Sequence, residues 1–486
     1  MKVMLSCPSD SPFAGPFMEK GPVSVPLGLA YLGAFIKDLP GIEVVGFDNN
    51  ALKLDPEEYR KIFQKEKPDI VAISILTPTV YMAWEMARVV KEVAPAAIVV
   101  AGGAHCSALP EDTLKEPALD YGVVGEGEET FRELILALRD KQDPAGIKNL
   151  VYRAKGRVIV NPKRPRMRDL DHIPLPAREI FGDSRYGMNV NRRVTSAKNT
   201  TVLTSRGCPY GCIFCSKSVY GREFLQRSPQ NVIDELKLLE WEGYGEVLIL
   251  DDTFTVNKNW VLEFCRLFVE QGLKTVWNCH ARVDTIDEDV VKALKQAHCS
   301  GLAFGIETGN AAMMKRIDKH ITLDEAREAI RLCRKYGLVT LCSYIFGHPD
   351  DTWQSVDDTL RFSLELDSDY ANFSVLFIAP GSKIFGELRQ KKAIEEGHWD
   401  HCIGQSKKLP DHSLCELTPV ELQAVTQKAF RKFYFRPQYI LRRLLRVRSP
   451  AMLGGLIRGA YLVVLFELQG VFKKFSRAGK RTHAPA

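Results

Sequence analysis

Short apolar runs alternate with stretches of helical periodicity through the first 140 residues of the chain. The runs predict β-strands at 2–6, 43–48, 69–75, 97–103 and 120–127, and the stretches between them predict helices near 26–38, 55–66, 78–93 and 128–140. Strands that alternate with helices form a parallel sheet covered on both faces. The pattern therefore predicts a doubly wound domain over 1–145, with its ligand crevice in the loops after Asp48, Ile75, Ala101 and Val124.

A second alternation follows a break in the pattern. Residues 146–195 mix prolines with charges, which predicts a linker containing one short hairpin. Further strands are predicted at 201–206, 246–250, 275–279, 302–307, 339–347 and 373–378. Six strand-helix units over 196–395 predict an incomplete (β/α)6 barrel, which would carry its chemistry at the carboxyl ends of the strands. Residues 396–486 are expected to form a mainly helical, basic C-terminal region.

The composition is that of a globular protein of more than one domain. The 486 residues exceed one ordinary core, and they are 45% hydrophobic and 26% charged. No apolar stretch suited to a secretory signal follows Met1, so the protein is expected in the cytoplasm. The twelve cysteines are then expected to be thiols rather than disulfides.

Basic charge is concentrated in the tail. Residues 428–486 hold fourteen Lys and Arg against one acid, Glu467, although the whole chain carries only +6, so no nucleic-acid partner is predicted for the protein. Within the tail, 435–449 and 459–472 are also apolar, but the longest uncharged run is too short to span a bilayer, which takes about 20 residues. Two interpretations stay open. The tail lies on an anionic membrane surface with its arginines at the head groups, or it packs on the barrel with solvated arginines.

The strongest chemical signal is the motif C-P-Y-G-C-I-F-C at 208–215, directly after the first strand of the second series. At this spacing Cys208, Cys212 and Cys215 can hold three irons of a 4Fe-4S cluster, which leaves the fourth iron open to a ligand. A structural zinc site would need a fourth ligand and usually has paired C-x2-C spacings. The motif resembles that of the radical S-adenosylmethionine (SAM) superfamily, and Phe214 stands at the usual aromatic position.

This resemblance implies a SAM site built from successive strand ends. Asp251 and Asp252 stand where the family holds the methionine amino group. Arg282 is expected to pair with the methionine carboxylate, since a guanidinium offers a fixed fork of donors. Glu307 is expected to bond the ribose, and Gly347 would let the backbone approach adenine.

The N-terminal domain resembles the cobalamin-binding module that precedes the barrel in one large radical SAM subfamily. The cobalamin-binding residues that this implies are Ser74, Leu76, Thr77, Gly102, Gly103, His105, Gly125, Glu126 and Gly127. In other classes the module supplies an axial histidine from D-x-H-x-x-G, but here D-N-N-A-L-K at 48–53 places Asn50 in that position. Cobalamin is therefore expected without a histidine ligand from this loop, and His105 is the alternative ligand.

The resemblance implies an enzyme that uses one electron from a low-potential donor to cleave SAM into methionine and a 5′-deoxyadenosyl radical. It favours cobalamin-dependent C-methylation of an unactivated carbon in a small molecule, lipid-like or otherwise apolar if the tail meets a membrane. An oxidative cyclase, as in anaerobic chlorophyll synthesis, remains an alternative. A non-catalytic sensor is disfavoured because it needs only one cofactor, and methylthiolation of transfer RNA would need more N-terminal cysteines than Cys7 and Cys106. No catalytic side chain and no particular substrate can be assigned.

Overall fold

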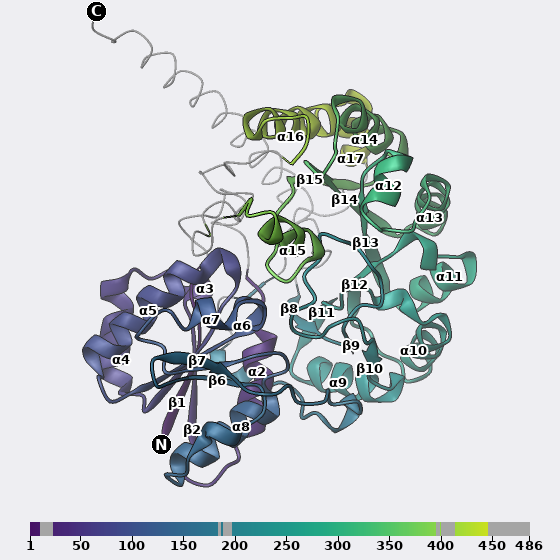
Figure 1. The fold of residues 1–486 in the computed structure, drawn as a ribbon. Helices are drawn as coiled ribbons and strands as arrows, with labels where there is room; N and C mark the ends of the chain where they lie inside the picture. The colour runs from purple at the N-terminus through teal and green to yellow at the C-terminus, as the bar shows by residue number, and fades with distance from the viewer. Residues whose placement is uncertain (10–22, 183–185, 188–196, 395–398, 400–413, 446–486) are drawn as a thin grey trace, which may run out of the picture.

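The computed structural model describes residues 1–9, 23–182, 186–187, 197–394, 399 and 414–445. It contains two α/β units, of which the N-terminal one lies at the lower left of Figure 1 and the second at the right. The expected fold class is confirmed.

The N-terminal unit is built on a seven-stranded sheet in the order β2-β1-β3-β4-β5-β6-β7. Its strands are β1 (Lys2–Cys7), β2 (Glu43–Asp48), β3 (Ile70–Ser74), β4 (Ile98–Gly102), β5 (Tyr121–Val123), β6 (Leu150–Ala154) and β7 (Arg157–Val160). The first five are parallel, and the order around β1 and β3 is the flavodoxin-like one, whose ligand crevice lies at the carboxyl ends of the strands.

Helices cover both faces of this sheet. They are α2 (Leu27–Ile36), α3 (Asn49–Leu52), α4 (Pro56–Glu66), α5 (Val80–Val93), α6 (Gly103–Ala108), α7 (Pro110–Thr113) and α8 (Glu128–Arg139). In β3, Ile70 and Ala72 pack into one hydrophobic cluster, while Val71 and Ile73 pack into another. Alternate residues of one strand thus reach opposite cores, which is why the strand is a continuous apolar run.

The predicted hairpin is formed by β6 and β7, and it continues the first sheet. β6 pairs antiparallel with β5, and β7 pairs with β6. Residues 150–160 therefore belong structurally to the N-terminal sheet rather than to a free linker, so the sheet extends beyond the expected boundary at residue 145.

The second unit contains a six-stranded parallel sheet in the order β15-β14-β13-β12-β11-β8. Its strands are β8 (Lys198–Val202), β11 (Tyr244–Ile249), β12 (Val276–Ala281), β13 (Cys299–Glu307), β14 (Val339–Phe346) and β15 (Tyr370–Val375). The main helices are α9 (Pro229–Trp241), α10 (Lys258–Glu270), α11 (Glu288–Gln296), α12 (Ala311–Arg316), α13 (Leu323–Tyr336), α14 (Trp353–Leu366) and α15 (Lys383–Gln390). α9, α10, α11 and α13 line the outside of the sheet in Figure 1. The sheet is an open half-barrel.

The strand predicted at 201–206 is divided in two. Its first part belongs to β8, while β9 (Ser205–Arg206) pairs antiparallel with β10 (Leu225–Gln226) in a separate small sheet. This pair closes the base of the loop 207–224, which contains the three cysteines of the motif.

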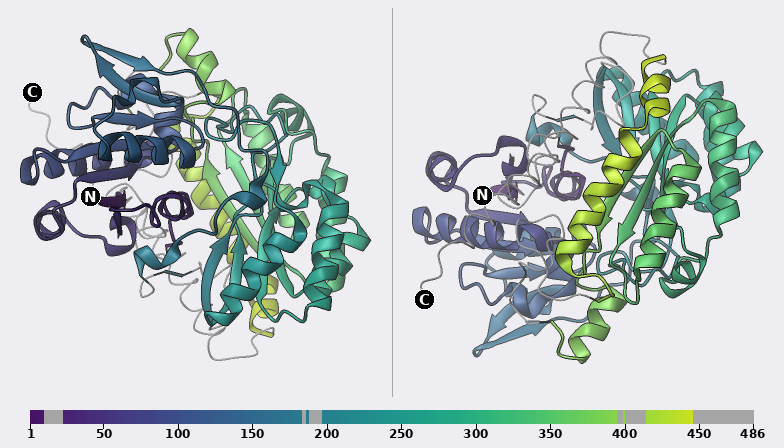
Figure 2. Two further views of the ribbon diagram at one scale, coloured as in Figure 1. Left: turned by 90° about the horizontal axis from the view of Figure 1, so that it is seen from below. Right: turned by 90° about the horizontal axis from the view of Figure 1, so that it is seen from above.

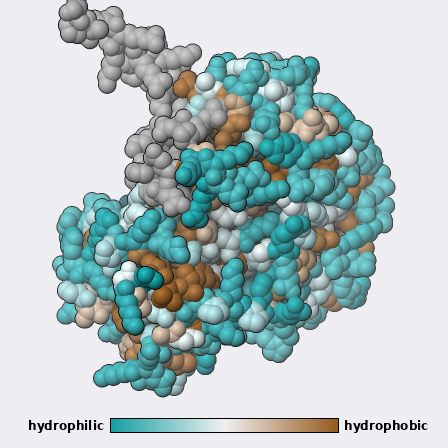
Figure 3. Space-filling view, in the orientation of Figure 1, coloured by the Kyte–Doolittle hydropathy of each residue, from teal (hydrophilic) through white to brown (hydrophobic). Residues whose placement is uncertain are grey.

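Two C-terminal helices complete the described chain, α16 (Pro419–Tyr434) and α17 (Pro437–Leu445). α16 packs beside β15, where Phe430 and Phe433 contact Phe373, and Figure 2 shows it running along the edge of the half-barrel. No helix in the described part of the chain is both long and apolar enough to cross a membrane. The segment 459–472 lies outside the described residues. The face in Figure 3 is mostly hydrophilic, with a large hydrophobic area over the N-terminal unit and smaller ones over the second unit.

Candidate functional site

The base of the cysteine loop is held by a buried carboxylate. Asp251, at the end of β11, is fully buried and accepts four hydrogen bonds from the backbone N–H and the hydroxyl groups of Thr204 and Ser205. These bonds draw the chain out of β8 and into β9, which explains the divided strand. Gly207 follows at φ +88°, and a Cβ there would lie 2.3 Å from the Glu223 carbonyl oxygen. Only glycine fits this turn.

Cys208, Cys212 and Cys215 lie together in this loop. Exclusion of water and the Asp252 carboxylate raise the pKa of the Cys215 thiol to about 11, and the other two thiols of the motif add to the rise. Lys217 ties the loop by donating to the carbonyl oxygens of Cys208 and Tyr210. Five other cysteines, Cys265, Cys279, Cys299, Cys333 and Cys342, are buried in the hydrophobic core.

The three cysteine thiols suit an iron-sulfur cluster, whose irons favour soft sulfur ligands. Among the described residues, no three His, Cys, Asp or Glu side chains converge at the distances that one metal ion requires. A cluster does not need such convergence, because each thiolate binds a different iron. Gly211 leaves room inside the loop, since a Cβ there would lie 2.4 Å from an Asp318 carboxylate oxygen.

The two neighbouring aspartates after β11 have different surroundings. All the hydrogen bonds of the buried Asp251 carboxylate are made inside the barrel, as described above. Asp252 is exposed beside the cysteine loop, where partial desolvation raises the pKa of its carboxyl and Lys217 opposes the rise. Asp252 is therefore the better placed of the two to meet an ammonium group.

Arg282 lies near the loop but is already paired. Its guanidinium donates to both carboxylate oxygens of Asp284 at 2.9 Å and to the Lys319 carbonyl oxygen at 2.8 Å. It also stacks 3.6 Å from the centre of the Tyr210 ring, which belongs to the cysteine motif. A carboxylate ligand at this point would share the arginine with Asp284.

Glu307 forms a buried ion pair that the sequence did not reveal. Its Oε1 accepts from Lys319 Nζ at 2.9 Å, and both residues are only 7% exposed. Although burial opposes it, the Glu307 carboxylate raises the pKa of Lys319. Glu307 also ends β13 with φ +70°, a strained backbone for a residue with a side chain. Strain of this kind is concentrated at functional sites, and no local motif marked Lys319.

Gly347 and His348 follow β14. Gly347 has φ +87°, and a Cβ there would approach Leu422 of α16 to 2.8 Å, so packing against α16 already requires glycine. The His348 ring lies 5.3 Å from the Phe214 ring of the cysteine motif. It is fully buried, and neither ring nitrogen has a hydrogen-bond partner among the described residues. Burial, together with the Lys319 charge, lowers the pKa of His348 to about 3, so the imidazole is neutral.

The proposed cobalamin residues meet at one edge of the N-terminal sheet. The loops after β3 and β4 are joined by hydrogen bonds from Ile75 N to Gly102 O and from His105 N to Ile75 O. The loop after β5 joins them, since Gly125 N donates to Ser107 Oγ at 2.9 Å. Gly103 has φ +92°, and a Cβ there would lie 2.7 Å from the Ile75 carbonyl oxygen. The edge is thus a small-residue surface that a large planar ligand can approach closely.

The remaining residues proposed for cobalamin are placed as follows. Ser74 ends β3, and its Oγ would lie 3.2 Å from a Cβ at Gly103. Leu76 is 52% exposed, whereas Thr77 is buried. Gly127 immediately precedes α8. The Glu126 carboxylate bonds arginines of other segments.

His105 is enclosed within the N-terminal unit, although its Nε2 has no hydrogen-bond partner among the described residues. Its Nδ1 lies 3.1 Å from Thr77 Oγ1, its Nε2 lies 3.8 Å from Asp112 Oδ2, and the imidazole is fully buried. The Trp399 ring covers it at 5.2 Å and donates its own N–H to Asp112. This enclosure favours the expectation that cobalamin has no histidine ligand. Asn50 is engaged locally, accepting from Lys53 at 2.7 Å.

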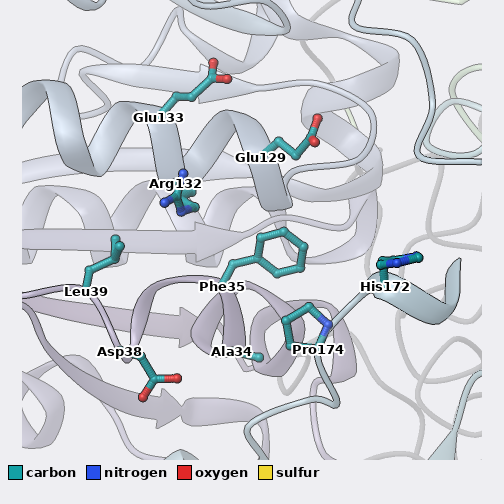
Figure 4. A pocket seen from close by; sticks show the side chains of 9 residues that line it. All are labelled: Ala34, Phe35, Asp38, Leu39, Glu129, Arg132, Glu133, His172 and Pro174. Carbon is teal, nitrogen blue, oxygen red and sulfur yellow. The ribbon is translucent and has the colours of Figure 1, made fainter. Parts of the chain in front are cut away.

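A separate cavity of about 480 Å³ lies between α2, α8 and the segment around His172. Figure 4 shows Glu129, Arg132 and Glu133 on one side and Phe35 and nearby residues on the other. None of the candidate cofactor residues lines it, so it does not belong to the site.

Comparison with known proteins identifies two family domains along the chain. Residues 202–363 match the model of the radical SAM superfamily, and residues 20–135 match that of the B12 binding domain. The chain is 33% identical to an uncharacterized methyltransferase of Pyrococcus horikoshii, over 91% of this chain and 94% of that one. It is 28% identical to the anaerobic magnesium-protoporphyrin IX monomethyl ester cyclase of Rubrivivax gelatinosus, over 76% and 67% of the two chains.

The fold is similar to that of the radical SAM methyltransferase TsrM from Kitasatospora setae, solved with cobalamin and a 4Fe-4S cluster bound. The TM-score is 0.66 at 21% identity, and 81% of this chain and 78% of that one are covered. The chain therefore belongs to the radical SAM superfamily and is an enzyme of the group that carries a B12-binding domain before the barrel. The cofactors expected from the sequence, a 4Fe-4S cluster, SAM and cobalamin, are those of this group.

Proposed function

We propose that the chain is a cobalamin-dependent methyltransferase that methylates an unactivated carbon of a small molecule. The observation that carries this proposal is that the cysteine loop lies against the proposed cobalamin edge. Ser218, just after the motif, donates to the Ala104 carbonyl oxygen at 3.3 Å, and a Cβ at Gly381 would contact both Ser218 and Ala108. Both implied cofactors would then lie on either side of this contact.

When bound, the cluster would supply the electron that cleaves SAM, and cobalamin would supply the methyl group. The chain's own residues bind and orient. Cys208, Cys212 and Cys215 would hold the cluster, Asp252 would meet the methionine ammonium group, and Arg282 its carboxylate. Glu307 and Lys319 form a buried ion pair near Arg282, where the ribose of SAM is expected to bind.

The relatives of this chain support methyl transfer and also favour an alternative. The Pyrococcus relative is named a methyltransferase, whereas the Rubrivivax relative is named a cyclase. Cyclisation without methyl transfer is therefore the second candidate function.

Turnover with methyl-labelled SAM distinguishes these functions. The anaerobically reconstituted protein is incubated with a low-potential reductant and host-cell extract, fractionated into lipids, pigments and polar metabolites. Methyl transfer predicts 5′-deoxyadenosine together with label in one product. Formation of 5′-deoxyadenosine with an unlabelled oxidised product would favour the cyclase, and no 5′-deoxyadenosine would overturn both.

We also infer a membrane surface as a partner, through the outer face of α17. The exposed fractions of Ile440, Leu441, Leu444 and Leu445 are 43%, 60%, 53% and 77%, and these positions share one face of the helix. The arginines point the other way. Arg436 and Arg442 pair with Asp367, and Arg443 lies 3.5 Å from Asp369. Both interpretations of the tail placed the arginines of this helix outward, and for α17 that placement is wrong.

This arrangement changes the expected binding behaviour. The arginines are paired with the barrel and the leucines are exposed. Binding of α17 to a membrane is therefore driven by burial of apolar surface and should depend weakly on salt. Cosedimentation with anionic vesicles should be lost in a variant with serine at 441, 444 and 445. It should persist in Trp241→Ser, a control on α9 whose side chain is also exposed. Equal sedimentation of the two variants would overturn the proposal.

A further inference from the structure

Arg206 links the base of the cysteine loop to the N-terminal unit. It ends β9, one residue before the Gly207–Cys208 step, and is only 4% exposed. Its guanidinium donates to Glu126 Oε1 at 3.1 Å and to Glu128 Oε1 at 2.6 Å. Both carboxylates follow β5, at the proposed cobalamin edge.

A second guanidinium completes this cluster. Arg166 contacts the other oxygen of Glu126 at 3.3 Å and donates to the backbone carbonyl oxygens of Arg206 and Glu223, at the two ends of the cysteine loop. The Arg206 guanidinium also lies 5.2 Å from the Tyr31 ring and 5.5 Å from the Tyr220 ring. Two cations thus meet two carboxylates. Glu126 and Glu128 are therefore neutralised by Arg206, at the base of the cysteine loop, together with Arg166 from the segment after β7.

The geometry of this contact is restrictive. A guanidinium presents its donors in a rigid fork, so one arginine that bonds two different carboxylates fixes both direction and distance. Burial would lower the pKa of the Arg206 guanidinium, but the carboxylates of Glu128 and Glu126 raise it. A shift of the interface would leave buried charges unpaired, which is strongly unfavourable.

Stability of the loop alone does not require Arg206. The β9–β10 pair and the Asp251 hydrogen bonds already hold the base of the loop within the barrel. The Arg206 side chain adds a restraint between the barrel and the N-terminal unit. We propose that Arg206 is a positioning residue, which sets the distance between the cluster and the cobalamin through Glu126 and Glu128.

This inference rests on the proposed function, because it takes both cofactors to be bound. It also gives Glu126 a different role from the cobalamin contact that the sequence suggested. The Glu126 carboxylate is bonded to Arg206 and Arg166, so it orients the two sites rather than holding the corrin.

The test uses the magnetic interaction between the two cofactors. In the anaerobically reconstituted holoenzyme, the reduced cluster and cob(II)alamin each carry an unpaired spin, and their interaction depends steeply on distance. The wild type is expected to give one defined splitting. Arg206→Lys and Glu128→Gln should lose it in favour of a broad distribution, because lysine cannot bond both carboxylates and glutamine removes one charge.

Arg227→Lys is the matched control. Arg227 is 5% exposed, and its side chain bonds Leu203, Asn231 and Glu235 within the barrel unit. The Arg227→Lys variant should have lower stability but an unchanged magnetic splitting between the two cofactors. An unchanged splitting in Arg206→Lys and Glu128→Gln, or an equal loss in the control, would overturn the inference.

Metal analysis of the same samples separates this test from that of the proposed function. A wild type that holds iron but no cobalt would overturn the proposed function and the inference together. A wild type that holds both metals and forms 5′-deoxyadenosine, with a splitting insensitive to Arg206, would overturn the inference alone.

Discussion

The neighbouring aspartates Asp251 and Asp252 offer a sharp test of the site, because the family resemblance implied one role for both, whereas Asp251 is buried and hydrogen-bonded and Asp252 is exposed. In Asp251→Asn the amide oxygen can still accept from the two backbone N–H groups, but the hydroxyl protons of Thr204 and Ser205 lose their acceptor. A buried donor left without a partner costs about 1–3 kcal/mol, and two are left here, so the variant should be destabilised by roughly 2–6 kcal/mol.

Asp252→Asn should behave in the opposite way. Its side chain is exposed, and such substitutions usually change stability by no more than about 0.5 kcal/mol. If the carboxylate makes a charge-assisted bond to the methionine ammonium group, its loss costs about 1.5–3 kcal/mol, or roughly a tenfold to 150-fold rise in the Kd for SAM.

Two measurements separate the variants. Urea unfolding of the cluster-free protein reports stability, and equilibrium dialysis of the reconstituted protein reports SAM binding. We expect Asp251→Asn to lower the urea midpoint and the iron content, and Asp252→Asn to raise only the Kd. The reasoning fails if Asp251→Asn unfolds like the wild type while Asp252→Asn leaves the Kd unchanged.

Further predictions follow from the cluster loop and two buried histidines. Replacing any one of the three motif cysteines by alanine should abolish SAM cleavage and reduce iron content, whereas Cys265→Ala should not; full activity in a motif variant would contradict the cluster assignment. Because His105 is enclosed, electron paramagnetic resonance of bound cob(II)alamin should show no imidazole nitrogen splitting in the wild type or in His105→Ala. In the folded protein the pKa of His348 is lowered to about 3, whereas in the unfolded chain the imidazole binds a proton below about pH 6.5. The contribution of His348 to stability is therefore complete above about pH 6.5 and is lost as the pH falls toward 3, by about 1.4 kcal/mol per pH unit. His348→Leu should show a correspondingly weaker loss of urea stability between about pH 6 and pH 4, and identical slopes would refute the pKa assignment.

Local sequence patterns were enough to predict the two α/β units and the cysteine loop. Periodicity is local, so a continuous apolar run such as 69–75 could be recognised as a buried strand without its neighbours. The spacing of Cys208, Cys212 and Cys215 is equally local, because a short loop brings its own side chains together. The family resemblance added the candidate SAM-binding residues at the strand ends. They are expected to lie together because the carboxyl ends of parallel strands meet at one edge of the sheet.

Tertiary structure alone decided which partner each polar side chain meets. Asp251 is bonded to Thr204 and Ser205, 47 and 46 residues away, and Glu126 to Arg206, 80 residues away. The same holds for α17. Its sequence indicates an amphipathic helix, but only the fold shows that the arginines there pair with Asp367 of the barrel. A charged or hydrogen-bonding group is satisfied by whichever segment the fold brings within reach, and nothing in the local pattern names that segment.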